Sequence, residues 1–154
     1  MVSNGLPQGD VLSPTLFNMY TASLHKINSD DTVLVQYADD FGLIVKAKSL
    51  EELNDKVQEK TDILTNELNK LNFSVNPQKT KIILFQNSIN NLSIRIDGEY
   101  IETVKSHMYL GITLDRFLSF GIHIKSTKQK IYRPIKYDKS YKQRKIWCSP
   151  GNYD

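Results

Sequence analysis

Residues 33–45 read VLVQYADDFGLIV and place two adjacent carboxylates, Asp39 and Asp40, between two short apolar runs. The runs, 33–37 and 41–45, are rich in β-branched and aromatic residues, so each is predicted to be a strand. Because only a few residues separate them, we expect a hairpin. Neighbouring side chains on a strand point to opposite faces, so two adjacent carboxylates converge on one ion only near a turn. The tip of the hairpin is therefore a candidate metal site.

Two carboxylates, Asp39 and Asp40, are suited to bind a metal ion that also binds phosphate. Mg²⁺ binds oxygen ligands and usually takes one or two carboxylates together with substrate phosphates. The functional hypothesis is a site for phosphoryl or nucleotidyl transfer. The alternative is a plain turn, because Asp is common in turns. Asp30 and Asp31 form a second pair in a polar stretch without flanking strands, and we interpret them as a solvated loop.

Length and composition bound the class of protein. The chain has 154 residues, of which 40% are hydrophobic and 24% are charged, as in one globular domain or a part of one. We see no apolar run long enough for a transmembrane helix and no signal-peptide pattern. The single cysteine, Cys148, cannot form an internal disulfide, which fits a reducing compartment. We therefore expect an intracellular location, in the nucleus or the cytoplasm.

The net charge of +3 hides an asymmetry along the chain. Residues 125–145 contain nine Lys or Arg and one acid, Asp138, whereas the other residues hold 11 basic and 16 acidic side chains. A basic segment on a mildly acidic body is a candidate contact for a nucleic-acid backbone. The alternative, a solvated face or a disordered tail, remains open.

Two helices are predicted from apolar spacing. The first covers 14–27, with Ser13 as its cap and Pro14 at its first position. The second covers 50–71 and begins with a capping box from Ser49 to Glu52. Its apolar stripe is expected to face a sheet, and it consists of Leu50, Leu53, Val57, Leu64, Leu68 and Leu71.

The remaining elements complete an α+β chain. We expect a buried strand at 81–85, a hairpin that turns at Asp97-Gly98, a strand at 109–114 and a helix at 119–132. This order favours a largely antiparallel sheet with helices on one face, and with the Asp pair at the edge of the open face.

Four segments, in this order, resemble the motifs of reverse transcriptases from non-LTR retrotransposons of the insect jockey type. Residues 5–18, GLPQGDVLSPTLFN, resemble the motif before the second palm helix, and YADD at 37–40 resembles the catalytic hairpin. Residues 71–81, LNFSVNPQKTK, are similar to the lysine motif that comes next, and YLG at 109–111 is similar to the primer-grip strand. Leu114–Leu118 with His123 resemble the segment after the primer grip in insect-type elements, so the likeness covers roughly residues 4–131.

The resemblance implies a polymerase palm that uses Mg²⁺ (or Mn²⁺), an RNA template and a DNA primer. In this chemistry two metals about 3.5–4 Å apart act on the primer oxygen and the leaving oxygens. By resemblance Asp39 and Asp40 are the catalytic, metal-binding carboxylates, and Tyr37 lies near the primer terminus.

The other implied roles lie in loops and on the later strand. Pro7, Gln8 and Gly9 would form a turn against the template–nucleotide pair. Lys79 would face the triphosphate, although Lys81 competes for that place in the motif. Leu110 and Gly111 would belong to the primer grip, where Gly111 lets the strand bend.

Two departures from the family pattern limit these expectations. The family has a third metal-binding Asp on a strand well before the GLPQG segment, and only four residues precede Gly5 here. We therefore expect the fingers and the first catalytic strand to be missing. The isolated chain should then be inactive, bind metal weakly and self-associate through exposed apolar surface. Asp10 stands where the family commonly has a small residue, and the sequence suggests no role for it.

The resemblance also divides the chain. Residues 1–118 correspond to the C-terminal part of the palm with the primer-grip strand, and 119–133 to the start of a thumb-like helix. Residues 134–154 form a divergent basic tail, which a shifted frame or a spliced-in sequence would explain and which we expect to be disordered. The alternatives to a polymerase fragment are a nucleic-acid-binding module that uses 125–145 and a non-functional retroelement relic.

Overall fold

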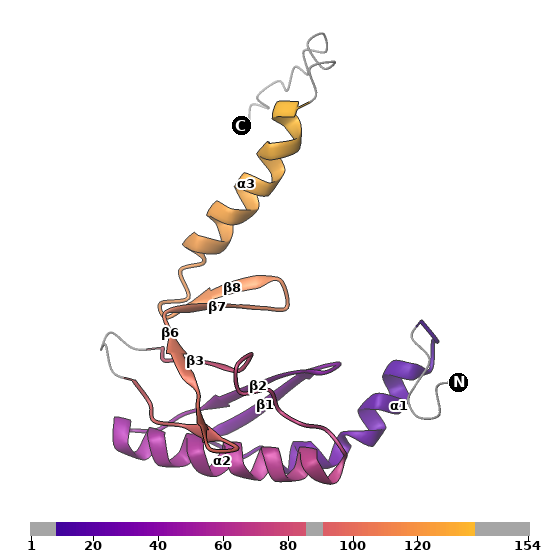
Figure 1. Cartoon of the computed structure of the whole chain (residues 1–154), viewed down its shortest axis with the longest axis vertical. Coiled ribbons are helices and arrows are strands. Elements are labelled where there is room, and N and C mark those ends of the chain that lie inside the picture. Colours follow the sequence, from indigo (N-terminus) through magenta and orange to yellow (C-terminus); the bar gives the residue numbers. More distant parts are fainter. Residues whose placement is uncertain (1–8, 86–90, 138–154) are drawn as a thin grey trace, which may run out of the picture.

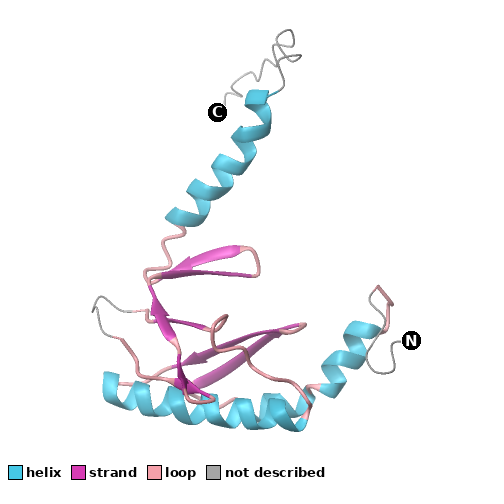
Figure 2. Ribbon diagram, in the orientation of Figure 1, coloured by secondary structure: helices cyan, strands magenta, loops and turns pink. Residues whose placement is uncertain are grey.

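A computed structural model describes residues 9–85 and 91–137, with the side chains of 133–137 left out. This part of the chain consists of three α-helices, one 3₁₀ helix and short strands (Figure 1). In chain order they are α1 (Ser13–Tyr20), the 3₁₀ helix η1 (Ala22–Ile27), β1 (Thr32–Tyr37), β2 (Asp40–Val45), α2 (Leu50–Lys70), β3 (Lys81–Ile83), β4 (Arg95–Ile96), β5 (Glu99–Tyr100), β6 (Glu102–Val104), β7 (Ser106–Tyr109), β8 (Ile112–Asp115) and α3 (Gly121–Tyr137). The mixture of helices and small sheets agrees with the predicted α+β class (Figure 2).

The strands do not form the single antiparallel sheet that we expected. The described strands make four separate two-stranded sheets: β1–β2, β3–β6, β4–β5 and β7–β8. Three of them are antiparallel hairpins, and β3–β6 is parallel. Within the described ranges, no third strand lies along β1 or β2. The outer edge of β1 is covered only in part, by Ser29 at Thr32 and by the Asn28 side chain at the Leu34 amide. None of the helices in these ranges is long and apolar enough to cross a membrane.

Helix α2 forms as predicted and serves two cores. The Ser49 side chain accepts a hydrogen bond from the Glu52 amide at 3.1 Å, and Glu52 accepts one from the Lys48 amide at 2.9 Å. The first half of the stripe, Leu50 to Val57, packs against one buried cluster: Leu84, Leu92, Ile94, Ile96 and Ile101. Farther along, Leu68 belongs to a second cluster with Leu24, Ile27 and Leu34, and Leu64 and Leu71 pack against it. The stripe is therefore core, as its spacing indicated.

The first predicted helix is broken in the middle. Residues 13–20 are α-helical, Thr21 leaves the helix, and 22–27 continue as the 3₁₀ helix η1. Only η1 joins the core under the β1–β2 hairpin, whereas α1 has no buried residue. Only the second half of the predicted helix 14–27 therefore packs on this hairpin. The reason lies at Thr21, whose hydroxyl bonds back to the Phe17 carbonyl at 3.0 Å, a pattern that bends helices.

The start of α1 also differs from the prediction. Leu12, not Ser13, is the residue before the first helical turn, and no side chain caps the helix there. Instead the Asp10 carboxylate accepts a hydrogen bond from the Leu12 amide at 2.9 Å, which gives Asp10 a role in the turn that enters α1.

The β7–β8 hairpin corrects the prediction of one strand over 109–114. Leu110 and Gly111 have φ of +48° and +81°, and Tyr109 pairs with Ile112. Two consecutive left-handed residues make a two-residue hairpin turn, for which Gly is well suited. Gly111 therefore reverses the chain rather than bending a continuous strand. Asp97-Gly98 forms the same kind of turn between β4 and β5, as predicted.

Helix α3 begins from a turn that Asp115 organises. The buried carboxylate of Asp115 accepts hydrogen bonds from the amides of Phe117, Ser119 and Phe120 and from the Ser119 hydroxyl, at 2.9–3.2 Å. Burial by itself would raise the pKa of this carboxyl, but these donors hold its pKa below the usual value. The helix then runs to Tyr137, past the predicted end at residue 132, and projects away from the body (Figure 1).

Candidate active site

The Asp pair lies at the tip of an antiparallel hairpin, as predicted. Tyr37 pairs directly with Asp40, which leaves Ala38 and Asp39 as a two-residue turn. Ala38 adopts a left-handed φ of +50°, which costs energy for a residue with a Cβ. Both carboxylates are exposed. Asp39 is thus presented by the turn itself, and Asp40 is the first residue of β2.

The two faces of this hairpin have different surroundings. Leu34, Phe41 and Leu43 lie in or against the core beneath the hairpin, toward η1 and α2. Because side chains alternate along a strand, Asp40 and Gly42 belong to the opposite face of β2. Figure 1 places α2 on one side of β1–β2 and the β7–β8 hairpin on the other. Asp40 therefore points away from α2, toward the side on which β7–β8 lies.

Tyr109 connects that second hairpin to β2. A Cβ placed on Gly42 would lie 3.4 Å from the Tyr109 hydroxyl oxygen and 3.5 Å from Cζ. The hydroxyl is buried and has no hydrogen-bond partner in the described part of the chain. Burial and, to a smaller degree, the negative charge of Asp40 raise the pKa of Tyr109. No sequence pattern indicated this contact, because 67 positions separate the two residues and only the YLG motif drew attention to Tyr109.

The other predicted site residues lie in several places. Tyr37 is exposed beside Asp40, and Gly9 has a left-handed φ of +91°. Pro7 and Gln8 lie outside the described residues. Leu110 and Gly111 form the tip of the β7–β8 hairpin. Among the described side chains, none of the contacts of Gly9, Leu110 or Gly111 brings them to the Asp pair.

The two candidate lysines differ in their surroundings. Lys79 is exposed in a turn that begins at Asn76, whose carbonyl and side-chain oxygens accept from the Lys79 amide. The Lys81 ammonium donates to the Glu102 carboxylate at 2.8 Å and so links β3 to β6. Lys81 is therefore engaged in an ion pair between two strands, whereas Lys79 lies exposed in the turn before β3.

The carboxylates present at this hairpin limit how metal ions could be held. Within 9–85 and 91–137, no group of three or more Asp, Glu, His or Cys side chains is placed to hold one. Exposed adjacent carboxylates at a turn fit one hard cation that keeps most of its water. The described residues alone do not fit a closed cage for two ions.

Gln36 is a residue near the site that the sequence did not single out. Its side-chain amide donates to the buried Thr21 hydroxyl at 2.9 Å and to the Ala38 carbonyl at 3.3 Å. It thus ties the turn that presents Asp39 to the junction between α1 and η1. A polar residue in an otherwise apolar strand is the signal that could have indicated such a contact.

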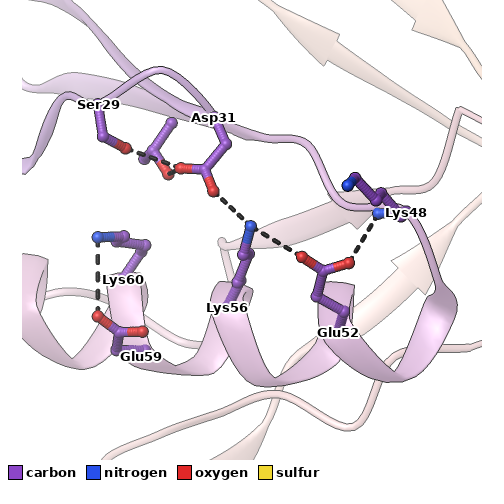
Figure 3. A network of polar contacts seen from close by, with 8 residues as sticks. Ser29, Asp31, Lys48, Glu52, Lys56, Glu59 and Lys60 are labelled. Atoms are coloured by element: carbon purple, nitrogen blue, oxygen red, sulfur yellow. Dashed lines mark hydrogen bonds and ion pairs between the residues drawn. The ribbon is translucent and has the colours of Figure 1, made fainter.

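The two residues of the second aspartate pair, Asp30 and Asp31, have different surroundings. Asp30 is exposed, as expected of a solvated loop. Asp31 instead accepts hydrogen bonds from the hydroxyls of Ser29 and Thr32 at 2.8 and 3.1 Å and forms an ion pair with Lys56 of α2 (Figure 3). Lys56 also contacts Glu52 at 3.0 Å. The interpretation of Asp31 as solvated was therefore wrong, because a polar face of α2 lies within reach of the loop.

This network makes stability depend on pH. The Lys56 ammonium and the two hydroxyls hold the pKa of Asp31 well below its ordinary value of 3.8. A carboxyl with a lowered folded-state pKa stabilises the fold above its unfolded pKa and loses that contribution as pH falls through the folded value. We expect the urea midpoint of the chain to fall as pH is lowered from about 5 to about 3, and Asp31→Asn to show a smaller fall. Asp30→Asn is the control. If the urea midpoint of Asp31→Asn fell as much as that of the wild type over this pH range, Asp31 would not be the source of the pH dependence.

Comparison with known proteins identifies the family of the chain that carries this hairpin. The family model described as "Reverse transcriptase (RNA-dependent DNA polymerase)" matches residues 1–114. The chain therefore belongs to the reverse transcriptase family.

Several curated proteins from mobile elements are similar to this chain. The RNA-directed DNA polymerase from mobile element jockey of Drosophila funebris is 33% identical over 132 residues, 81% of this chain and 14% of that protein. The probable RNA-directed DNA polymerase from transposon BS of Drosophila melanogaster is 34% identical over 140 residues, 84% of this chain and 15% of that protein. The predicted resemblance to non-LTR retrotransposon enzymes is thus confirmed, and the chain spans about one seventh of these relatives. No solved structure matches it.

Proposed function

We propose that this chain is the part of an RNA-directed DNA polymerase that carries the catalytic hairpin. The observation that supports this best is the exposed turn that presents Asp39, with Asp40 on the open face of β2, in a chain that the reverse transcriptase family model matches over residues 1–114. The reaction is transfer of a nucleotide from a deoxynucleoside triphosphate to the end of a DNA primer on an RNA template. The whole enzyme supplies the further carboxylate and the nucleotide-gripping region.

The side chains have distinct tasks in this proposal. Asp39 and Asp40 hold Mg²⁺ or Mn²⁺, which neutralises the charge that develops on the phosphoryl oxygens. Lys79, exposed and separate from the Lys81–Glu102 pair, faces the triphosphate. Tyr37 lies next to Asp40 and faces the primer terminus. Pro7, Gln8 and Gly9 contact the template–nucleotide pair, and Leu110 and Gly111 contact the primer.

The domain assignment belongs to the same proposal. Residues 1–118 are the C-terminal part of the palm and 119–133 begin a thumb-like helix, although α3 continues to Tyr137. Residues 138–154 of the proposed tail lie outside the described part of the chain. The location in the nucleus or cytoplasm stays a prediction.

A metal titration tests the carboxylate assignment in the isolated chain. Two exposed carboxylates leave most of the coordination shell to water, so we expect Mg²⁺ or Mn²⁺ to bind only at millimolar concentrations. NMR should show shifts of the amides around residues 37–41, and Asp39→Asn should abolish them. Tight binding, or shifts that survive this substitution, would show that the metal site is elsewhere.

We also expect the isolated chain to self-associate. No further strand covers the β1–β2 hairpin in the described residues, and α1 exposes Leu16, Met19 and Tyr20. Unpaired edges and contiguous apolar surface promote association. Analytical ultracentrifugation should give a mass that grows with concentration, whereas a monomer at high concentration would refute this expectation.

A second candidate function is binding of nucleic acid through α3. Residues 121–137 contain five Lys or Arg and no acid, and Lys125, Lys128 and Lys130 are exposed on a helix that projects from the body (Figure 1). The base of α3 is held by the Thr113 amide, which donates to His123 Nδ1 at 3.3 Å. Binding to phosphates should weaken steeply as salt is raised. This function and the polymerase role are compatible, because a template–primer duplex offers the same phosphates.

A further inference from the structure

The contact between Tyr109 and Gly42 joins the β7–β8 hairpin to the hairpin that carries the Asp pair. The Tyr109 ring packs over Gly42: a Cβ built on this glycine would lie 3.4–3.9 Å from the nearest atoms of the phenol, which is ordinary van der Waals contact. Gly42 has no left-handed φ that would by itself require glycine. Neither the backbone nor the space around it therefore requires a glycine here, and the observation that matters is the contact itself, which brings the phenol onto β2.

The same contact brings the tyrosine to the side of the sheet that carries Asp40. Asp40 and Gly42 are two residues apart on β2, so their side-chain positions lie on one face of the strand. Burial and then the negative charge of Asp40 raise the pKa of the Tyr109 phenol, as expected for a carboxylate on this side of the sheet. Asp40 is exposed, and no described residue donates a hydrogen bond to its carboxylate.

The tyrosine hydroxyl is buried without a partner among the described residues, which is costly for a folded protein. Buried hydroxyls are normally hydrogen-bonded, and each exception calls for an explanation. A phenylalanine would fill the same space over Gly42 without that cost. Packing alone therefore does not explain the hydroxyl, and the Asp40 carboxylate is a hydrogen-bond acceptor on the same face of β2.

We propose that Tyr109 is a positioning residue for catalysis, whose hydroxyl donates a hydrogen bond to the Asp40 carboxylate when the template, primer and nucleotide are bound. This inference rests on the proposed function. The fixed ring defines the direction from which the proton is offered, so one carboxylate oxygen is held by Tyr109 and the other is left for the metal. Tyr109 itself touches neither substrate nor metal.

The test uses Tyr109→Phe in the complete polymerase and in the 154-residue chain. In the polymerase we expect kcat for primer extension to fall about tenfold, as for loss of a hydrogen bond to a charged group, with KM for the primer–template unchanged. In the isolated chain the urea midpoint should stay the same or rise, because an unpaired buried hydroxyl is removed. Tyr100→Phe, at an exposed tyrosine of the β4–β5 hairpin, is the control and should leave kcat unchanged.

Each outcome has one meaning. A normal kcat in Tyr109→Phe overturns the positioning role, and if Asp39→Ala is inactive in the same assay the proposed function survives. A raised primer KM with normal kcat overturns it as well, because the hydroxyl then contacts the primer. A lowered urea midpoint together with lowered activity shows a merely structural tyrosine and also overturns it. If Asp39→Ala retains full activity, the proposed function itself fails.

Discussion

Asp39→Ala should abolish primer extension when it is introduced into a polymerase that joins this chain to the preceding part of a reverse transcriptase domain. Asp39 forms the hairpin turn, and its exposed carboxylate is the proposed ligand of the catalytic ion. The ion supplies several kcal/mol of charge stabilisation in the transition state. Since each step of about 1.4 kcal/mol is a factor of ten, we expect a loss on the order of a thousandfold or more in kcat. Extension of a labelled DNA primer on an RNA template, with Mg²⁺ and deoxynucleotides, measures it.

The chain supplies its own matched control for this experiment. Asp30 is also an exposed aspartate that is followed by a second one, but it lies in the loop before β1 rather than at the hairpin tip. Asp30→Ala should keep extension nearly intact. Asp31 is unsuitable as a control, because its contact with Lys56 ties the loop to α2. Equal activity of Asp39→Ala and wild type would refute the metal-ligand assignment.

The β1–β2 hairpin and the α2 helix were predictable because local signals agreed with their tertiary surroundings. The β-branched runs, the short separation and the alternation between them specify β1–β2, and the capping box with its leucine stripe specifies α2. The Asp97-Gly98 turn is likewise encoded by its two residues. In each case the decisive interactions connect residues close in sequence.

The errors arose where distant segments decide the structure. Whether short strands combine into one sheet depends on partners far along the chain. Strand β3, for example, pairs with β6, and β4 and β5 lie between them in the sequence. The hydrogen bond between Gln36 and Thr21 likewise joins residues that are 15 positions apart. The Asp31–Lys56 pair and the Tyr109–Gly42 contact are also long-range, so no local pattern announces them.

The largest expected effect on folding is that of Leu68→Ala. Leu68 is 2% exposed and contacts the cluster of Leu24, Ile27 and Leu34 beneath the β1–β2 hairpin. Truncation of a buried leucine costs about 2–5 kcal/mol in free energy of unfolding, which is a large share of the roughly 5–15 kcal/mol of a typical domain. Urea denaturation followed by circular dichroism should show this loss. Ile63→Ala, at an exposed isoleucine of the same helix, should cost about 1 kcal/mol or less.

The position of Leu68 predicts which part of the fold loses stability in Leu68→Ala. Because α2 serves two separate clusters, the cavity left at residue 68 lies under β1 and away from Ile94. Hydrogen exchange should therefore accelerate more at the amide of Leu34 than at that of Ile101, which donates to the Ile94 carbonyl at 2.9 Å. Equal acceleration at both amides would mean that the two clusters unfold as one unit. A greater effect at Leu34 would show that the support of the proposed catalytic hairpin is local, and Leu68→Ala would then reduce extension by loosening the turn that presents Asp39.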